Sequence, residues 1–149
     1  MAQTYFGSTV RAGSTSLSDA TDGGFMVLMQ TSTVTTVAAG TAVSVTEVLP
    51  ANSQIINFFI DQVVDEVVGG GTATAINATI GTAAAGTQYL SSTNVIAGGR
   101  AALTFTAAQL SAMADIGSNT SIVLTIAPNG TISTTQGVYR FTVVYAQKV

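Results

Sequence analysis

The sequence contains no cysteine and no histidine. Without cysteine the chain forms no disulfides and has no thiol nucleophile, and without histidine it lacks the commonest general base and the usual metal ligand. A serine or threonine nucleophile would need an activating base, and the only lysine is Lys148, one residue from the end of the chain. These absences exclude hydrolytic triads. We therefore expect a protein that is not an enzyme and that binds no cofactor.

Charge is also scarce, because charged residues make up 7% of the sequence against about 25% in ordinary soluble domains. Serine and threonine take the place of lysine and glutamate, so copies of the molecule repel one another little and association is expected. The net charge of −3 has the wrong sign for binding phosphates, which argues against nucleic acid as a partner.

Long apolar runs are missing as well, since none approaches the roughly 20 residues that a membrane helix needs. The first residues lack the basic start and apolar run of a secretory signal. We expect synthesis in the cytoplasm and no membrane partner.

What the sequence does contain is room for one domain preceded by an arm. Residues 1–24 are rich in glycine, serine, alanine and aspartate, whereas residues 25–149 have a β-like pattern. Two interpretations of the arm stay open: it lies along a neighbouring subunit, or it folds back onto its own domain. In the first case the candidate interface residues of the arm are Tyr5, Phe6, Val10 and Arg11.

The pattern after residue 25 predicts an all-β fold, an antiparallel β-sandwich of jelly-roll type. β-Branched residues recur at every second position between closely spaced turn signals, as in 25–37, 42–49 and 72–80. The most apolar segment, 54–68, is expected to form a central strand buried on both faces, followed by a second segment. Asn129-Gly130 predicts a type I′ turn after strand 120–127, with a return that begins at 131–134, passes a bulge or second turn at 136–137 and continues as the last strand 138–146. The last strand directs one row of side chains to the core, namely Tyr139, Phe141, Val143 and Tyr145.

One short helix is predicted over residues 106–116. A capping box, a hydrophobic staple and a terminating glycine agree on its position, and they are formed by Thr106 with Gln109, Phe105 with Leu110, and Gly117. The apolar residues Leu110 and Met113 are expected to face the core, with the helix at one open end of the sandwich.

The few charged residues offer the remaining candidate sites. Asp61, Asp65 and Glu66 form the only local acidic cluster, which could bind Ca²⁺ or could be a solvated strand end that prevents edge pairing. The second interpretation is favoured because the spacing of a known calcium loop is absent. The segment 98–100, Gly-Gly-Arg, lacks the strand-to-helix context of an anion site and predicts a turn. Arg140 is expected on the exposed face of the last strand, as a candidate interface residue.

Three stretches resemble small virion proteins of tailed bacteriophages. They are the Leu49-Pro-Ala-Asn-Ser-Gln-Ile55 lead into an apolar strand, the segment from Ile80-Gly-Thr82 to Tyr89-Leu90, and the closing strand Gly137 to Tyr145. The likeness spans roughly residues 42 to 147. It implies a β-sandwich that binds the outside of a capsid as a cement or decoration protein, or else forms part of a tail, and it carries over no catalytic residues.

Together these observations lead us to expect a capsid cement protein at the virion surface. We expect a homo-oligomer, with a trimer as its form, whose contacts bridge subunits of the major capsid protein. One alternative is a tail or head-to-tail component of the same particle. Another is a carbohydrate-binding or adhesin module, which would need an aromatic groove although the sequence has no tryptophan and only four tyrosines.

Overall fold

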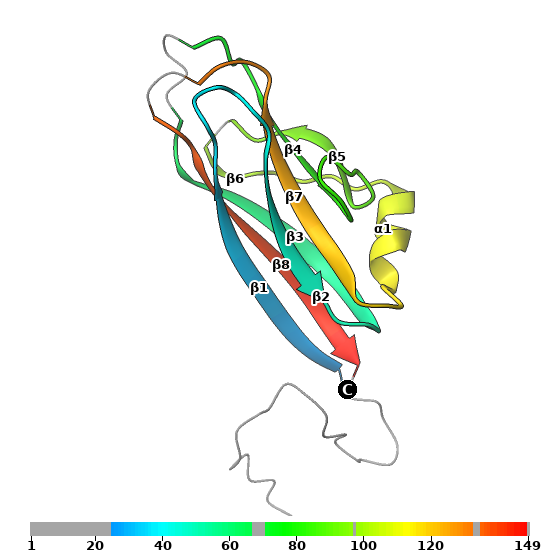
Figure 1. Ribbon diagram of the computed structural model, residues 1–149. Helices are drawn as coiled ribbons and strands as arrows, with labels where there is room; N and C mark the ends of the chain where they lie inside the picture. The colour runs from blue at the N-terminus through cyan, green and yellow to red at the C-terminus, as the bar shows by residue number, and fades with distance from the viewer. Residues whose placement is uncertain (1–24, 67–70, 97, 133–134, 149) are drawn as a thin grey trace, which may run out of the picture.

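The computed structural model describes residues 25–66, 71–96, 98–132 and 135–148 as a β-sandwich with one helix (Figure 1). The arm assigned to residues 1–24 lies outside the described residues. In chain order the elements are β1 (Phe25–Thr35), β2 (Val43–Leu49), β3 (Ser53–Val64), β4 (Ile76–Gly81), β5 (Leu90–Asn94), β6 (Gly99–Arg100), α1 (Ala107–Ala114), β7 (Thr120–Pro128) and β8 (Val138–Lys148).

The strands form two four-stranded antiparallel sheets, with the orders β1-β8-β3-β6 and β2-β7-β4-β5. Within them β1 pairs with β8, β2 with β7, β3 with β6 and β4 with β5. These pairings are those of one long antiparallel ribbon whose successive strand pairs alternate between two packed sheets, which is the arrangement of a jelly roll. The predicted fold class is confirmed.

The core lies between the two sheets and is lined by alternating side chains. The inward row predicted on β8 is buried throughout, at Tyr139, Phe141, Val143 and Tyr145. Facing it from the second sheet are Ile122, Leu124 and Ile126 of β7, all fully buried. The ring of Phe58 lies 5.9 Å from that of Phe141 and 6.3 Å from that of Phe105, between centroids, so aromatic packing joins β3, β8 and the segment before the helix.

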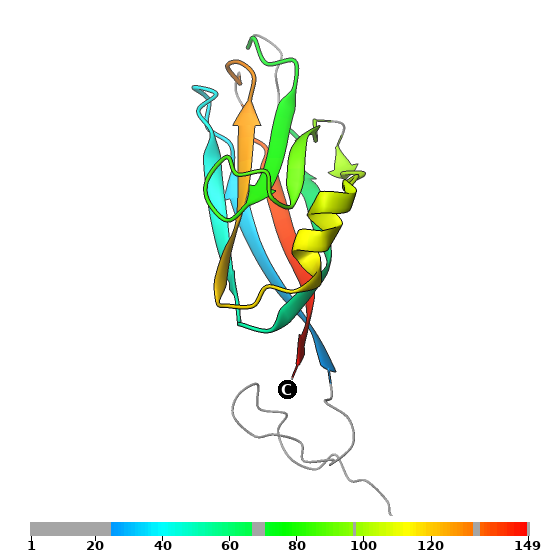
Figure 2. The same ribbon diagram turned by 90° about the vertical axis from the view of Figure 1, so that its right-hand side faces the viewer.

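The start of the helix is as predicted. The Thr106 hydroxyl accepts the main-chain N–H of Gln109, and the Gln109 side chain accepts the main-chain N–H of Thr106, so the capping box is present. The helix itself is shorter than the predicted 106–116. It lies beside β5 and β3, and thus closes one side of the sandwich rather than an end (Figures 1 and 2).

Of the two helix residues predicted to face the core, only one does so. Met113 is buried, but Leu110 is 53% exposed, and the buried position one residue earlier belongs to Gln109. The Gln109 amide donates to the main-chain oxygen of Thr87 and to the hydroxyl of Ser91. Because residues four apart share a helix face, the contact of Gln109 with β5 turns Met113 inward and Leu110 outward.

Two further strand predictions are wrong. β3 is not buried on both faces, because Ile56 and Val63 are exposed on the outer face of their sheet. The hairpin expected at Asn129-Gly130 does not form, since β7 and β8 belong to different sheets and neither turn residue has the positive φ that a type I′ turn requires. The Asn129 side chain instead accepts the main-chain N–H groups of Thr74 and Ala75, at 2.8 and 2.9 Å.

Within the described residues, α1 is far too short to cross a membrane, and no other helix is long and apolar enough to do so.

Candidate interaction surface

The outer face of the β1-β8-β3-β6 sheet is the surface with the most distinctive chemistry, and we call it the outer face below. The strand registers place its side chains in rows that run across the sheet. Each row takes one residue from each of β1, β8 and β3, namely Thr33, Arg140 and Asp61; Thr31, Thr142 and Phe59; and Met29, Val144 and Asn57.

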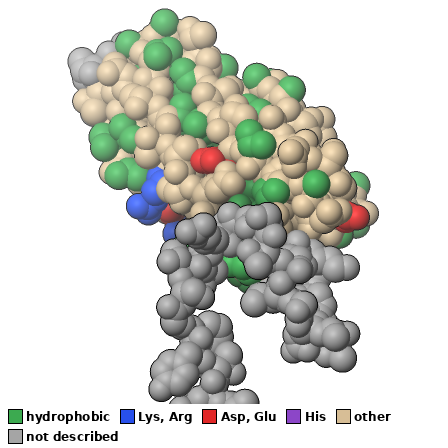
Figure 3. Space-filling model, turned by 60° about the horizontal axis from the view of Figure 1, so that its bottom comes forward, with side chains coloured by type: hydrophobic (Ala, Val, Ile, Leu, Met, Phe, Trp, Pro, Cys, Tyr) green, Lys and Arg blue, Asp and Glu red, His purple; other side chains and the backbone are tan. Residues whose placement is uncertain are grey.

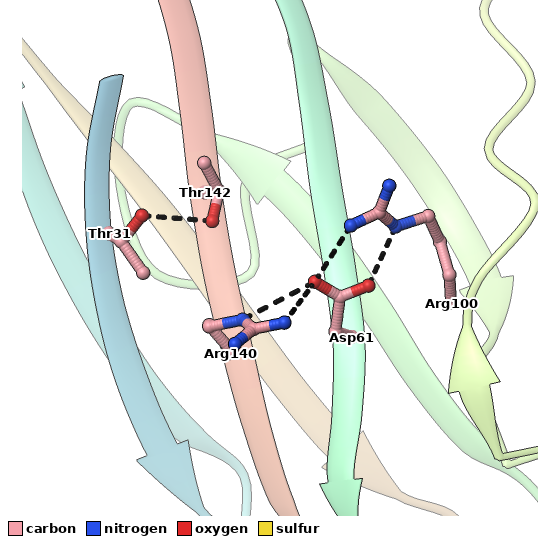
Figure 4. A network of polar contacts seen from close by, with 5 residues as sticks. All are labelled: Thr31, Asp61, Arg100, Arg140 and Thr142. Atoms are coloured by element: carbon pink, nitrogen blue, oxygen red, sulfur yellow. Dashed lines mark hydrogen bonds and ion pairs between the residues drawn. The ribbon is translucent and has the colours of Figure 1, made fainter.

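The first row ends in an ion-pair cluster, which we call the Asp61 triad (Figure 4). The Asp61 carboxylate on β3 accepts two hydrogen bonds from Arg100 of β6, at 2.7 and 3.2 Å. Arg140 of β8 reaches the same carboxylate at 3.1 Å. The Asp61 side chain is 11% exposed, whereas those of Arg100 and Arg140 are 59% and 48% exposed. One carboxylate is thus covered by two cations that still face solvent.

The triad has a clear electrostatic consequence. The hydrogen bond from Arg100 does most to lower the pKa of Asp61, and it outweighs desolvation, which acts in the opposite direction; Arg140 lowers that pKa further. Asp61 in turn raises the pKa of Arg100. The Arg100 guanidinium also lies 4.4 Å from the centre of the Phe59 ring, in a cation–π contact. With two cations against one anion, the triad keeps one excess positive charge and unused N–H donors at the surface.

The next two rows along the sheet are uncharged. The hydroxyls of Thr31 and Thr142 are 3.0 Å apart. Beyond them Val27 and Met29 are 65% and 70% exposed, and Ile56 is also exposed. In the view of Figure 3 the described surface is mostly neutral, and its basic side chains gather in one place. The outer face therefore combines one ionic cluster with solvent-exposed apolar side chains.

The structure divides the predicted acidic cluster. Asp61 belongs to the triad, whereas the Glu66 carboxylate accepts the Tyr139 hydroxyl at 2.8 Å and the Gln62 amide at 2.9 Å. Burial, and then the hydrogen bond to Glu66, raise the pKa of Tyr139. Asp65 is exposed. In the described part of the chain, no three side chains of the metal-ligating types come together.

The other predicted site residues fall in three groups. Arg140 lies on the exposed face of β8, as expected, and pairs within its own chain. The turn predicted at Gly98-Gly99 is present, with φ values of +75° and +69°, and it leads into β6. Tyr5, Phe6, Val10 and Arg11 lie outside the described residues.

Sequence reasoning missed the convergence of Arg100 and Arg140 on one carboxylate. Charge scarcity was the available signal, since the chain has only four basic and seven acidic residues from which an ion pair could form. Which carboxylate they share depends on the order β8-β3-β6, and no local pattern encodes that order.

Comparison with protein-family models, with curated proteins and with solved structures found no match, so the functional argument depends on the fold and on the chemistry of the outer face.

Proposed function

We propose that this protein is a structural, non-catalytic component of an assembled particle, namely a capsid cement or decoration protein that binds the lattice of a major capsid protein. The observation that carries the proposal is the exposure of Val27, Met29 and Ile56 on one sheet face of a chain that is very poor in charge. Exposed apolar patches of this kind mark surfaces that another protein covers.

The outer face supplies two kinds of contact to such a partner. Its apolar side chains gain free energy when they are removed from water, in proportion to the area buried. The guanidinium groups of Arg100 and Arg140 are held in place by Asp61, so their outward N–H groups can donate to a carboxylate or carbonyl of the partner with little loss of side-chain freedom. Apolar contact would thus supply affinity and the triad would supply orientation.

The assembly role does not require a tight contact at each copy. A homo-oligomer that engages several capsid subunits at once gains from multivalency, so a modest interface per copy holds the lattice together. Bridging of this kind would close the gaps that internal pressure opens between capsid subunits.

The fold supports the proposal only by analogy, because jelly rolls occur in viral capsid proteins and also in lectins. A lectin commonly presents aromatic rings to sugars. Among the described residues, however, the three tyrosines, Tyr89, Tyr139 and Tyr145, are all buried in the core. This burial favours the assembly role over carbohydrate binding.

Copy counting tests the proposal directly. Purified particles from the source of the sequence would be digested and quantified by mass spectrometry against labelled standards. A copy number comparable to that of the major capsid protein supports a cement protein. A number lower by more than tenfold indicates a tail or head-to-tail component, and absence from particles contradicts both assignments.

The contact surface is tested by cosedimentation of the full chain with particles that lack it. Ile56→Asp puts a charge on the outer face and is expected to abolish binding. Thr46→Asp makes the same change at an exposed position of β2, on the other sheet, and should bind as the unmodified chain does. Equal binding by the two variants would exclude the outer face. A chain that lacks residues 1–24 tests the arm in the same assay, and we expect it to fold but not to bind.

A further inference from the structure

The two sheets end in four edge strands, and three of them are blunted against pairing with another chain. Edge strands expose unpaired N–H and C=O groups, and proteins protect them by shortness, irregular pairing, charge or cover. β6 has only two residues and ends in the ion-paired Arg100. β5 has five residues, its pairing with β4 is interrupted by a register shift, and Gln109 of α1 binds Ser91 within it.

β2 is protected in another way. Glu47 lies in its inward-facing row, and an inward-pointing charge is one of the devices that discourage strand addition. In addition, the side-chain amide of Gln30 donates to the main-chain oxygen of Val48, at 3.0 Å. One carbonyl of the β2 backbone is therefore already satisfied by a side chain of β1.

In the described part of the chain, β1 has none of these protections. It is 11 residues long, its register with β8 is continuous, and its sequence FMVLMQTSTVT contains no charge, proline or glycine. Among the described residues, only β8 makes hydrogen bonds with the β1 backbone. Val27 and Met29, beside the free edge, are the most exposed of the large hydrophobic residues in the described part. The chemistry of this edge fits an extended, uncharged strand.

We propose that the β1 edge pairs with the β1 edge of a second copy, antiparallel and about a two-fold axis, to give a continuous eight-stranded sheet. Two-fold contacts use the same surface on both partners, and β1 can meet itself without like-charge repulsion because it carries no charge. Full overlap of Phe25–Thr35 with its copy places Gln30 opposite itself and Met29 opposite Thr31. This register keeps Val27 and Met29 on the outer face of both copies.

The pairing is independent of the capsid assignment, and it predicts a dimer as the basic unit where the sequence led us to expect a trimer. Analytical ultracentrifugation of the full chain at micromolar concentrations should give twice the chain mass of 15.0 kDa. The double variant Met29→Lys with Thr31→Lys sets cations opposite one another across the axis, and it should raise the dissociation constant at least about tenfold.

Val63→Lys is the matched control, because Val63 is exposed in the same sheet but lies on β3, away from the free edge. It should dimerise as the unmodified chain does. Circular dichroism should show that all variants keep the sandwich. A monomeric unmodified chain would overturn the proposal, and so would an oligomer of any size that persists unchanged in the double lysine variant.

Cross-linking tests the register, and the absence of native cysteine makes the readout unambiguous. Met29→Cys combined with Thr31→Cys places thiols directly opposite each other in the proposed pair, so mild oxidation should give a covalent dimer. Either single variant should cross-link much less, because its two thiols lie diagonally across the axis. Absence of covalent dimer in the combined variant would overturn the pairing.

Discussion

The solvent-facing sides of the two sheets differ in how far their side chains are already bonded or covered within the chain. The face of β1-β8-β3-β6 carries the Asp61 triad and leaves Val27 and Met29 in solvent. The face of β2-β7-β4-β5 presents hydroxyl groups, and the loop between β4 and β5 lies over it, where Ala85 donates its main-chain N–H to the Thr125 hydroxyl at 2.9 Å (Figure 2). One face is thus partly covered by its own chain, whereas Val27 and Met29 on the other have no cover among the described residues.

Polarity alone does not distinguish the two faces. Both faces carry threonine hydroxyls, as at Thr31 on the outer face and Thr125 on the other. What separates them is whether their hydrogen-bonding and apolar groups already have partners within the chain. Thr125 is buried and bonds Ser44 and Ala85, whereas Met29 has nothing over it among the described residues.

The largest loss of unfolding free energy is expected from Asp61→Ala, which removes the anion of the triad. Two guanidinium groups would then face each other without their shared carboxylate. Because both are about half exposed, solvent screens the pairs and the expected loss of unfolding free energy is about 1 to 2 kcal/mol. Urea denaturation measures it. Asp65→Ala removes an exposed carboxylate nearby and should change stability by less than about 0.5 kcal/mol. Equal losses in the two variants would show that the triad is energetically neutral.

Acid should reduce the stabilisation that Asp61 gives to the fold. The pKa of Asp61 in the folded chain lies below its ordinary value of 3.8, so the triad stabilises the fold above that value and loses its contribution as the pH falls through the lowered pKa. The stability gap between the unmodified chain and Asp61→Asn should be constant from about pH 5 to 7 and should narrow below about pH 4. Urea midpoints across this range would measure the gap. A gap that widens in acid would contradict the assigned direction.

On the outer side of the β2-β7-β4-β5 sheet, Thr125→Val should loosen the attachment of the loop between β4 and β5. The change keeps the shape of the side chain but removes the hydroxyl that accepts the N–H of Ala85 and pairs with Ser44. Loss of these bonds at a buried site should cost about 1 kcal/mol and should speed proteolysis within residues 82–88. Ser121→Ala, at an exposed position of the same strand, is the control. Unchanged proteolysis would mean that the loop is held by other contacts.

Local sequence patterns predicted local structure, but they failed where the structure depends on contacts between strands that are distant in the sequence. Alternation found the inward row of β8, and the spacing of Thr106 and Gln109 found the start of the helix, because each depends on a few neighbouring residues. The Asn129-Gly130 hairpin was wrong because β7 and β8 each have two better partners elsewhere in the chain. The burial of Gln109 in place of Leu110 depends on contacts with Thr87 and Ser91, about twenty residues away. The triad could not be placed for the same reason.

The smallest change in unfolding free energy is expected for a substitution within the outer face, away from the triad. Thr31 and Thr142 are cross-strand neighbours whose hydroxyls bond each other at 3.0 Å in an exposed position. Replacing both with valine removes the bond but keeps β-branching, so the unfolding free energy should change by only about 0.5 kcal/mol. The same change adds two apolar side chains next to Met29 and Val144, and a face that binds a partner by apolar contact should then bind it more tightly. Weaker cosedimentation of the double valine variant with particles, at unchanged stability, would instead show that the partner forms hydrogen bonds with the two hydroxyls. The two faces would then differ in geometry rather than in apolar exposure.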